Sequence, residues 1–246
     1  MSAGTPAQLP FDRRGGLIVL VDPGRCTPEA ALGLAARAAA SDACGFLIGD
    51  SLGNGAKLAA HVAAMREGAP GLPIVQFPAS AAELSADVDA VLFLALLSGR
   101  NPRYLIEEQV RAVPFFDRHP RVRAISTAYL LVEGGRTSSV ELASRTQPLA
   151  ADAPDVVAAH VRAAQLLGMH ATYLEAGSGA VTPVGPRVIA AAREATTGPL
   201  LVGGGITNAA AARAAREAGA DYVVVGTLFE RAPRADVQPL ASAARA

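Results

Sequence analysis

Eight short apolar runs, each followed by a stretch of helical character, constrain the fold of this chain more than any other feature. The runs are continuous rather than alternating in polarity, which is typical of strands buried on both faces. Helix-forming segments between strands favour a parallel sheet. The expected strands span residues 17–21, 45–49, 73–77, 89–94, 122–132, 171–175, 199–202 and 221–225.

The segments between these runs carry helix signals. Thr27 before Pro28 resembles an N-cap followed by proline in the first turn, and Gly219 marks a helix end before the last strand. The segment 79–88 is short, so we expect only a rudimentary helix there. The expected helices span residues 28–41, 57–66, 102–116, 154–168, 185–197 and 208–219.

Eight such strand–helix units predict an α/β fold, a closed (β/α)8 or TIM barrel. The length of 246 residues agrees with the ~250 typical of this fold. We therefore predict a single domain over residues 1–246, with residues 1–14 as a loose N-terminal extension. A doubly wound open sheet is the alternative.

Charge and cysteine content narrow the classes of function. The 22 basic and 22 acidic residues cancel, so we expect no nucleic-acid partner. Cys26 and Cys44 form no disulfide framework and indicate reduced thiols in a cytoplasmic protein. The N-terminus shows no signal-peptide pattern, and no apolar run approaches the ~20 residues that span a membrane.

Lysine is nearly absent from the chain. Lys57 is the only lysine, and it lies at the start of an expected helix rather than at a strand end. Schiff-base aldolases and pyridoxal-phosphate enzymes need a lysine aimed into the site. The composition therefore disfavours both classes.

Three glycine-rich turns follow the sixth, seventh and eighth expected strands. Glycine lets backbone N–H groups approach an anion, and in (β/α)8 barrels the loops after strands 7 and 8 often hold phosphate. The turns therefore predict a phosphate site. They are Ala176-Gly177-Ser178-Gly179, Gly203-Gly204-Gly205 and Gly226-Thr227.

Carboxylates stand at expected strand ends, where barrel enzymes carry their reacting groups. Asp22 is either a Mg²⁺ ligand or the cap of a turn. Ser51, next to Asp50, is a candidate ligand of the same metal, with an ordinary Asp-Ser turn as the alternative. Glu175 is a general base, a polar anchor for a substrate hydroxyl, or a capping carboxylate.

Aromatic side chains gather in the third to fifth strand–helix units. They either line an apolar groove or simply belong to the core. The residues alone thus indicate a metal-assisted site for a phosphorylated small molecule, with an apolar extension. The aromatic residues are Phe77, Phe93, Tyr104, Phe115, Phe116 and Tyr129.

From about residue 15 onward, the chain resembles the geranylgeranylglyceryl phosphate synthases, also called prenylglyceryl phosphate synthases. Two runs are highly specific: Tyr-Leu-Glu-Ala-Gly-Ser-Gly-Ala at 173–180 and Gly-Gly-Arg-Thr-Ser-Ser at 134–139. Further matching segments are 20–23, 49–53, 77–80, 90–94, 98–102, 128–133, 203–206 and 226–227.

The resemblance implies a Mg²⁺-dependent prenyltransferase on a (β/α)8 barrel, acting in ether-lipid biosynthesis. A geranylgeranyl-type prenyl group would pass from its diphosphate to the 3-hydroxyl of sn-glycerol 1-phosphate, releasing diphosphate. Asp22 and Ser51 would hold the metal, and Glu175 would orient or deprotonate the hydroxyl. We place the tail beside Phe77 and Phe93. Glycerol phosphate would contact Tyr173, Leu174, Glu175, Ala176, Gly177, Ser178, Gly179, Gly203, Gly204, Gly205, Gly226 and Thr227.

Two turns depart from the family pattern. The family usually has Asp-Pro-Asp-Lys after the first strand, where this chain has Asp-Pro-Gly24-Arg25. The second turn is usually Gly-Gly-Ser, and here Asp50 replaces the second glycine. One acid is lost and another gained, while arginine keeps the charge of lysine with a different donor geometry. These changes bear on the metal shell rather than on the reaction class.

Other functions stay open from the sequence alone. One is a prenyltransferase with another phosphorylated acceptor, such as 3-phosphoglycerate. A phosphosugar isomerase is another, and a third is a barrel that binds a phosphate ester or lipid without turnover. Since relatives form dimers or hexamers, we expect a homo-oligomer. We expect any membrane contact to be peripheral, through the lipid product.

Overall fold

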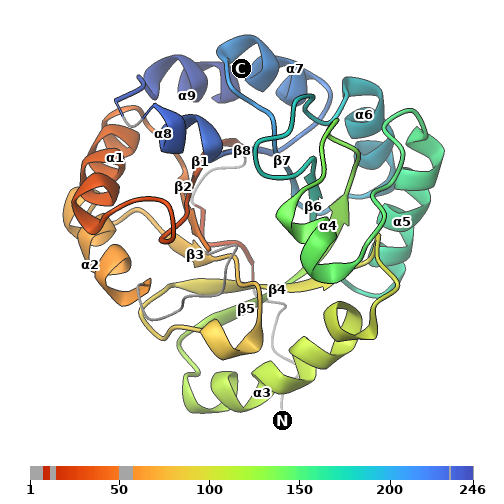
Figure 1. Cartoon of the computed structure of the whole chain (residues 1–246), viewed down its shortest axis with the longest axis horizontal. Helices are drawn as coiled ribbons and strands as arrows, with labels where there is room; N and C mark the ends of the chain where they lie inside the picture. Colours follow the sequence, from red (N-terminus) through yellow and green to blue (C-terminus); the bar gives the residue numbers. More distant parts are fainter. Residues whose placement is uncertain (1–7, 12–14, 50–57, 233, 246) are drawn as a thin grey trace.

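The computed structural model describes residues 8–11, 15–49, 58–232 and 234–245. Within them, eight parallel strands form a closed barrel in which each pairs with the next and β8 pairs with β1 (Figure 1). The barrel prediction is confirmed, and closure excludes the open sheet. The strands are β1 (Gly16–Val21), β2 (Gly45–Ile48), β3 (Ile74–Gln76), β4 (Ala90–Leu96), β5 (Arg123–Leu131), β6 (Ala171–Glu175), β7 (Leu200–Gly203) and β8 (Tyr222–Val225).

Helices surround the barrel, and each of the six expected ones is present (Figure 1). The predicted cap of the first helix is confirmed, because Thr27 Oγ1 accepts a hydrogen bond from the Ala30 N–H at 3.2 Å. The helix expected from residue 102 begins with one π-helical turn, η3 (Arg103–Glu107). The six are α1 (Pro28–Ala40), α2 (Leu58–Gly68), α3 (Glu108–Arg118), α5 (Pro154–Leu166), α6 (Pro186–Ala195) and α7 (Ala209–Glu217).

Three further helices were not expected from the sequence: α4 (Ser139–Ser144), α8 (Thr227–Arg231) and α9 (Gln238–Arg245). Each has at most eight residues, which is too short for a clear helical period. After β3 the chain forms only a 3-10 turn, η2 (Ala81–Glu83), as predicted. No helix of the described residues is long and apolar enough to span a membrane.

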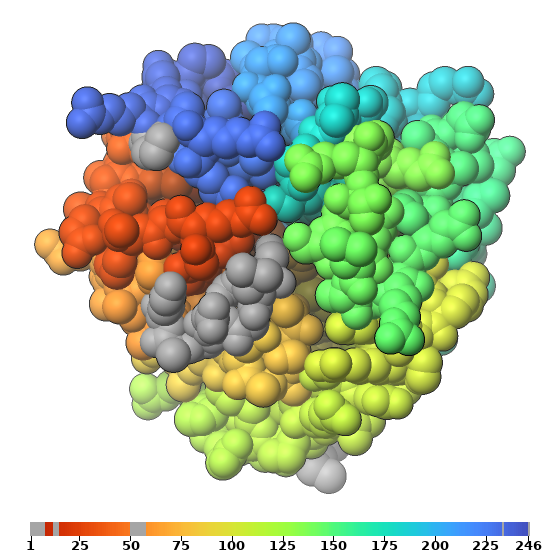
Figure 2. Space-filling model, viewed as in Figure 1, coloured from red at the N-terminus to blue at the C-terminus, as the bar shows by residue number. Residues whose placement is uncertain are grey.

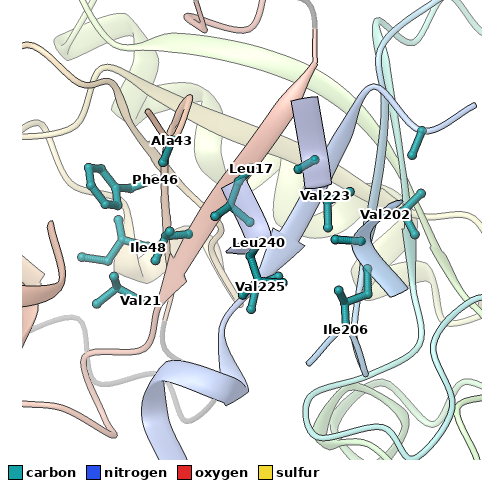
Figure 3. Packing of buried hydrophobic residues seen from close by; sticks show 14 of the residues in the cluster. Leu17, Val21, Ala43, Phe46, Ile48, Val202, Ile206, Val223, Val225 and Leu240 are labelled. Atoms are coloured by element: carbon teal, nitrogen blue, oxygen red, sulfur yellow. The ribbon is translucent and has the colours of Figure 1, made fainter. Parts of the chain in front are cut away.

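The core has two layers because successive side chains of a strand face opposite sides. In β1, Ile18 packs inside the barrel, whereas Leu17 and Val21 pack in the layer between the strands and the helices. Figure 3 shows part of this outer layer, where Leu240 of α9 lies beside Leu17 and Val225. The layers hold the strand ends rigidly, so the loops that follow them are well positioned.

The segment before β1 fills the N-terminal end of the barrel. Leu9 and Phe11 are buried at 8% and 7% exposure, and the Phe11 ring lies 5.3 Å from that of Tyr222. The prediction of a loose extension is therefore wrong for residues 8–11, because their two apolar side chains complete the inner core. Residues 1–7 and 12–14 lie outside the described part of the chain.

Candidate functional site

A cavity opens at the C-terminal end of the barrel, where the loops after the strands converge (Figure 1). This is the face on which (β/α)8 barrels carry their active sites. Figure 2 shows the same face, with the loop after β1 in red, the α4 region in green and α8 in blue around its centre. The polar end of the cavity is lined by Asp22, Glu175, Ser178, Gly179, Gly204, Thr227, Glu230 and Arg231.

Glu175 ends β6 and points into this cavity at 6% exposure. Its Oε1 accepts a hydrogen bond from the Gly177 N–H at 3.0 Å, which holds the carboxylate in place. Burial raises the pKa of Glu175, and the hydrogen bonding around the carboxylate offsets this only in part. A carboxylate with a raised pKa is a stronger base, which suits the removal of a proton from a substrate hydroxyl.

Tyr173 lies two residues earlier on the same face of β6 and is fully buried. Its ring packs 5.5 Å from Phe77 and 5.6 Å from Tyr129. Burial, together with the Glu175 charge, raises its pKa, so the hydroxyl keeps its proton. The hydroxyl oxygen lies close enough to Glu175 to influence both pKa values, yet no described residue meets hydrogen-bonding geometry with it. A substrate hydroxyl at this point would satisfy it.

The triple-glycine turn after β7 leaves room for these two side chains. A Cβ at Gly203 would lie 2.5 Å from the Tyr173 hydroxyl, and one at Gly204 would lie 2.5 Å from Glu175 Oε1. Gly204 also has a φ of 81°, in the left-handed region that favours glycine. The turn is therefore required by the acidic site as well as by any anion.

The turn after β6 approaches α8 closely. The Gly179 N–H donates to Thr227 Oγ1 at 3.1 Å, and Ser178 Oγ lies 3.4 Å from the same oxygen. Two arginines reach the turn as well. A Cβ at Gly179 would lie 3.2 Å from a terminal nitrogen of Arg231 and 3.3 Å from one of Arg136. The glycine-rich end of the cavity thus combines positive charge with hydroxyl groups, a combination that suits an anion.

Asp22 follows β1 at 6% exposure and lines the cavity on the side where β1 pairs with β8. Its Oδ1 accepts from the Gly24 N–H at 2.8 Å, and its Oδ2 lies 3.3 Å from Arg25 Nε. Arg25 also pairs with Glu230 of α8 at 3.1 Å. The two acids therefore share one arginine, which ties the first loop of the barrel to the last.

The cavity continues as an apolar arm between β4 and α3. Phe77 and Phe93 both line it, as the sequence predicts for an apolar groove. The Phe93 ring meets Phe116 of α3 edge-on at 5.7 Å, and Ala112 of the same helix lines the arm. Only the short turn η2 follows β3, which leaves this side of the barrel open to the arm. Such a channel suits a hydrocarbon chain.

The structure brings together most of the predicted site residues. Ala176, Gly177 and Gly203 support the cavity through backbone contacts without lining it. Leu174 is a correction: its side chain packs in the outer layer against the helices, because it alternates with Tyr173 and Glu175 along β6. Ser51 lies outside the described residues. The predicted residues that line the cavity are Asp22, Phe77, Phe93, Tyr173, Glu175, Ser178, Gly179, Gly204, Gly205, Gly226 and Thr227.

Three charged residues of the site were missed by the sequence analysis. Glu230 and Arg231 lie on α8, a five-residue helix without a periodic signal. Arg136 stands in the Gly-Gly-Arg-Thr-Ser-Ser run, whose specificity was the only available signal. A charged residue just after a phosphate-binding turn is the pattern that would have drawn attention to Glu230 and Arg231.

Fold and site together define a (β/α)8 barrel with a buried carboxylate, an anion site and an apolar arm in one cavity. This chain belongs to the PcrB family, since the family model matches residues 12–243. It is 38% identical over 214 residues to the geranylgeranylglyceryl phosphate synthase of Flavobacterium johnsoniae, covering 87% of both chains. It is 43% identical over 159 residues to the synthase of Zunongwangia profunda, covering 65% of this chain and 68% of that one.

A solved structure agrees with these relatives. The crystal structure of (S)-3-O-geranylgeranylglyceryl phosphate synthase from Thermoplasma acidophilum, in complex with substrate sn-glycerol-1-phosphate, is similar with a TM-score of 0.86. The sequences are 27% identical, and the match covers 93% of this chain and 92% of that one. The barrel and its loops therefore follow the arrangement of a protein that binds a phosphorylated polyol.

Proposed function

We propose that this protein is a geranylgeranylglyceryl phosphate synthase. It transfers a geranylgeranyl-type prenyl group from its diphosphate to the 3-hydroxyl of sn-glycerol 1-phosphate and releases diphosphate. The observation that carries the proposal is the single cavity that joins a buried carboxylate and an anion site to an apolar arm. The acceptor phosphate, the reacting hydroxyl and the hydrocarbon tail can therefore bind in neighbouring parts of one cavity. The names of the relatives support the same reaction.

The acceptor is held at the glycine-rich end. Ser178 and Thr227 line the cavity there and offer hydroxyl groups to its phosphate. At the other end of the short polyol, a hydroxyl reaches Tyr173 and Glu175. This spacing distinguishes a phosphorylated polyol from a free one, because both ends of the molecule are bound.

Glu175 acts on the acceptor hydroxyl. The Gly177 N–H fixes one carboxylate oxygen, which leaves the other to accept the proton as the oxygen attacks the allylic carbon. The protonated Tyr173 donates a hydrogen bond in the same place and keeps the hydroxyl oriented. Burial excludes water, which would otherwise compete with the acceptor for the prenyl group.

Mg²⁺ fits the β1 side of the cavity, where Asp22 offers carboxylate oxygen at the end of the strand. Ser51, which lies outside the described residues, is the second proposed ligand. No group of three or more acidic, His or Cys side chains gathers in the described part of the chain, so substrate oxygens would complete the shell. The metal would supply charge that stabilises the departing diphosphate.

Diphosphate release tests the function. We would supply Mg²⁺ and geranylgeranyl diphosphate and compare sn-glycerol 1-phosphate, its sn-3 enantiomer and 3-phosphoglycerate as acceptors. Turnover with sn-glycerol 1-phosphate alone is the expected result. Turnover with 3-phosphoglycerate alone would show that the protein uses a different acceptor. If the folded protein is inactive with all three acceptors, the proposal is refuted. Omitting Mg²⁺ tests the metal separately.

A further inference from the structure

Two arginines at the mouth of the barrel have no assigned role in the reaction derived above. Arg136 precedes α4 and Arg231 ends α8, so they come from segments far apart in the sequence (Figure 1). Their terminal nitrogens nevertheless converge within 3.3 Å of the position that a Cβ of Gly179 would take. Glycine at 179, with a φ of 69°, is what permits this approach.

Within the described residues, neither arginine forms a salt bridge, although Arg231 lies near enough to Glu230 to offset part of the rise that burial causes in the pKa of that carboxyl. No carboxylate there forms an ion pair with Arg136 or Arg231, and Arg136 makes only a long hydrogen bond of 3.5 Å to the Gly179 carbonyl. Arg25, at the same mouth, is different because both Asp22 and Glu230 hold it. Two unpaired guanidinium groups beside one turn repel each other unless an anion lies between them.

The surroundings of the pair indicate which anion it binds. Ser178 and Thr227 line the cavity next to Arg231, and their hydroxyl groups suit phosphate oxygens. Guanidinium groups form two parallel hydrogen bonds to such oxygens. Asp22, proposed above as the metal ligand beside the donor's diphosphate, follows β1 and pairs with Arg25, whereas Arg136 and Arg231 lie over Gly179 in the turn after β6.

We propose that Arg136 and Arg231 form a two-guanidinium clamp on the phosphate of the acceptor and thereby select a dianionic phosphate monoester. The proposal rests on the function proposed above for the location of the acceptor. The clamp closes the mouth over the phosphate from two sides, with Gly179 beneath it. It makes the affinity of the acceptor, rather than that of the donor, depend on these two charges.

The test separates binding from turnover. We would measure the dissociation constants of sn-glycerol 1-phosphate and of inorganic phosphate by calorimetry, without donor, for Arg136→Gln, Arg231→Gln and the double variant. Each single variant should bind sn-glycerol 1-phosphate about tenfold more weakly, and the double variant more weakly still. Arg231→Lys should recover part of the affinity by charge alone. Arg213→Gln, an exposed position of α7, is the matched control.

Kinetics with saturating donor complete the test. The KM for the acceptor should rise in the glutamine variants, while the KM for the prenyl diphosphate stays within about twofold. A rise in the donor KM with unchanged acceptor affinity would assign the pair to the diphosphate and overturn the clamp. Unchanged binding of both phosphates would also overturn it. Because calorimetry needs no turnover, an inactive wild-type protein would refute the proposed reaction without deciding the clamp.

Discussion

At the scale of single residues, Glu175 meets two opposed requirements. Its burial makes the carboxylate a better base, and the same burial destabilises the charged form in the folded protein. The Gly177 N–H holds the side chain in position but does not remove that cost. The buried charge that suits catalysis therefore lowers the free energy of unfolding.

Glu175→Gln should therefore lower turnover and raise stability. Loss of the base should reduce kcat by about tenfold or more. In wild type the raised pKa means that stability falls as pH rises from the ordinary carboxyl value of 4.5 through the folded value. The variant escapes this loss, so its thermal midpoint should exceed that of wild type at pH 7 and converge with it near pH 4.

The control for Glu175 is Glu194→Gln, an exposed position on α6. It should change neither turnover nor the pH dependence of the melting temperature. Near-normal turnover of folded Glu175→Gln would remove Glu175 from the mechanism. A stability difference between wild type and variant that is independent of pH would show that the Glu175 charge is not the cause.

Gly204→Ala should disturb the site beyond the strain of its backbone. Gly204 and Gly71 have similar φ values, 81° and 89°, but a Cβ at Gly71 meets nothing within 4 Å. Gly71→Ala should cost only the left-handed strain, about 1 kcal/mol, and leave turnover intact. Gly204→Ala adds a contact of 2.5 Å with Glu175 Oε1, so both stability and turnover should fall further. Equal effects in chemical denaturation and activity assays would contradict this account.

At the scale of elements, α3 and β4 enclose the apolar arm. Because η2 is only three residues long, the inner face of α3 rather than an intervening helix forms the wall. Ala112 and Phe116 contribute to it from α3, and Phe93 contributes from β4. We expect the volume left between them to set the length of the prenyl tail that fits.

Ala112→Phe should shorten the accepted prenyl chain. The added ring fills the arm, so the ratio of kcat/KM for geranylgeranyl over geranyl diphosphate should fall by about tenfold or more. Val110→Phe is the control, because Val110 lies on the outer face of the same helix at 62% exposure. An unchanged ratio in folded Ala112→Phe would place the tail elsewhere.

At the scale of the whole molecule, the two ends of the barrel differ in role. Leu9 and Phe11 fill the N-terminal end, whereas the cavity occupies the C-terminal end. Residues at the first end are expected to affect stability, and residues at the second to affect function. Because the barrel lies between the two ends, we expect substitutions at one end to leave the other unchanged.

Phe11→Ala should destabilise the protein and leave its kinetics unchanged. Removal of a buried ring that contacts Tyr222 should cost about 3 kcal/mol and lower Tm by roughly 6–12 °C. The KM values for both substrates should stay the same below the transition. Leu166→Ala, at an exposed position, is the control with little effect. A changed acceptor KM in Phe11→Ala would show that the two ends are coupled.

The sequence by itself determined the order of strands and helices and the strand-end positions of Asp22 and Glu175. Continuous apolar runs and glycine-rich turns are local patterns, so they can be recognised in the sequence without knowledge of the fold. The runs at 134–139 and 173–180 identified the family for the same reason.

Only the tertiary structure decided which side chains meet. Arg136 and Arg231 are far apart in sequence and join over Gly179 because β5, β6 and β8 end at one face of a closed barrel. Leu174 turned away from the site because the twofold period of β6 assigns it to the outer layer. Phe11 became core for a related reason: closure of the barrel creates an end that an apolar side chain must fill.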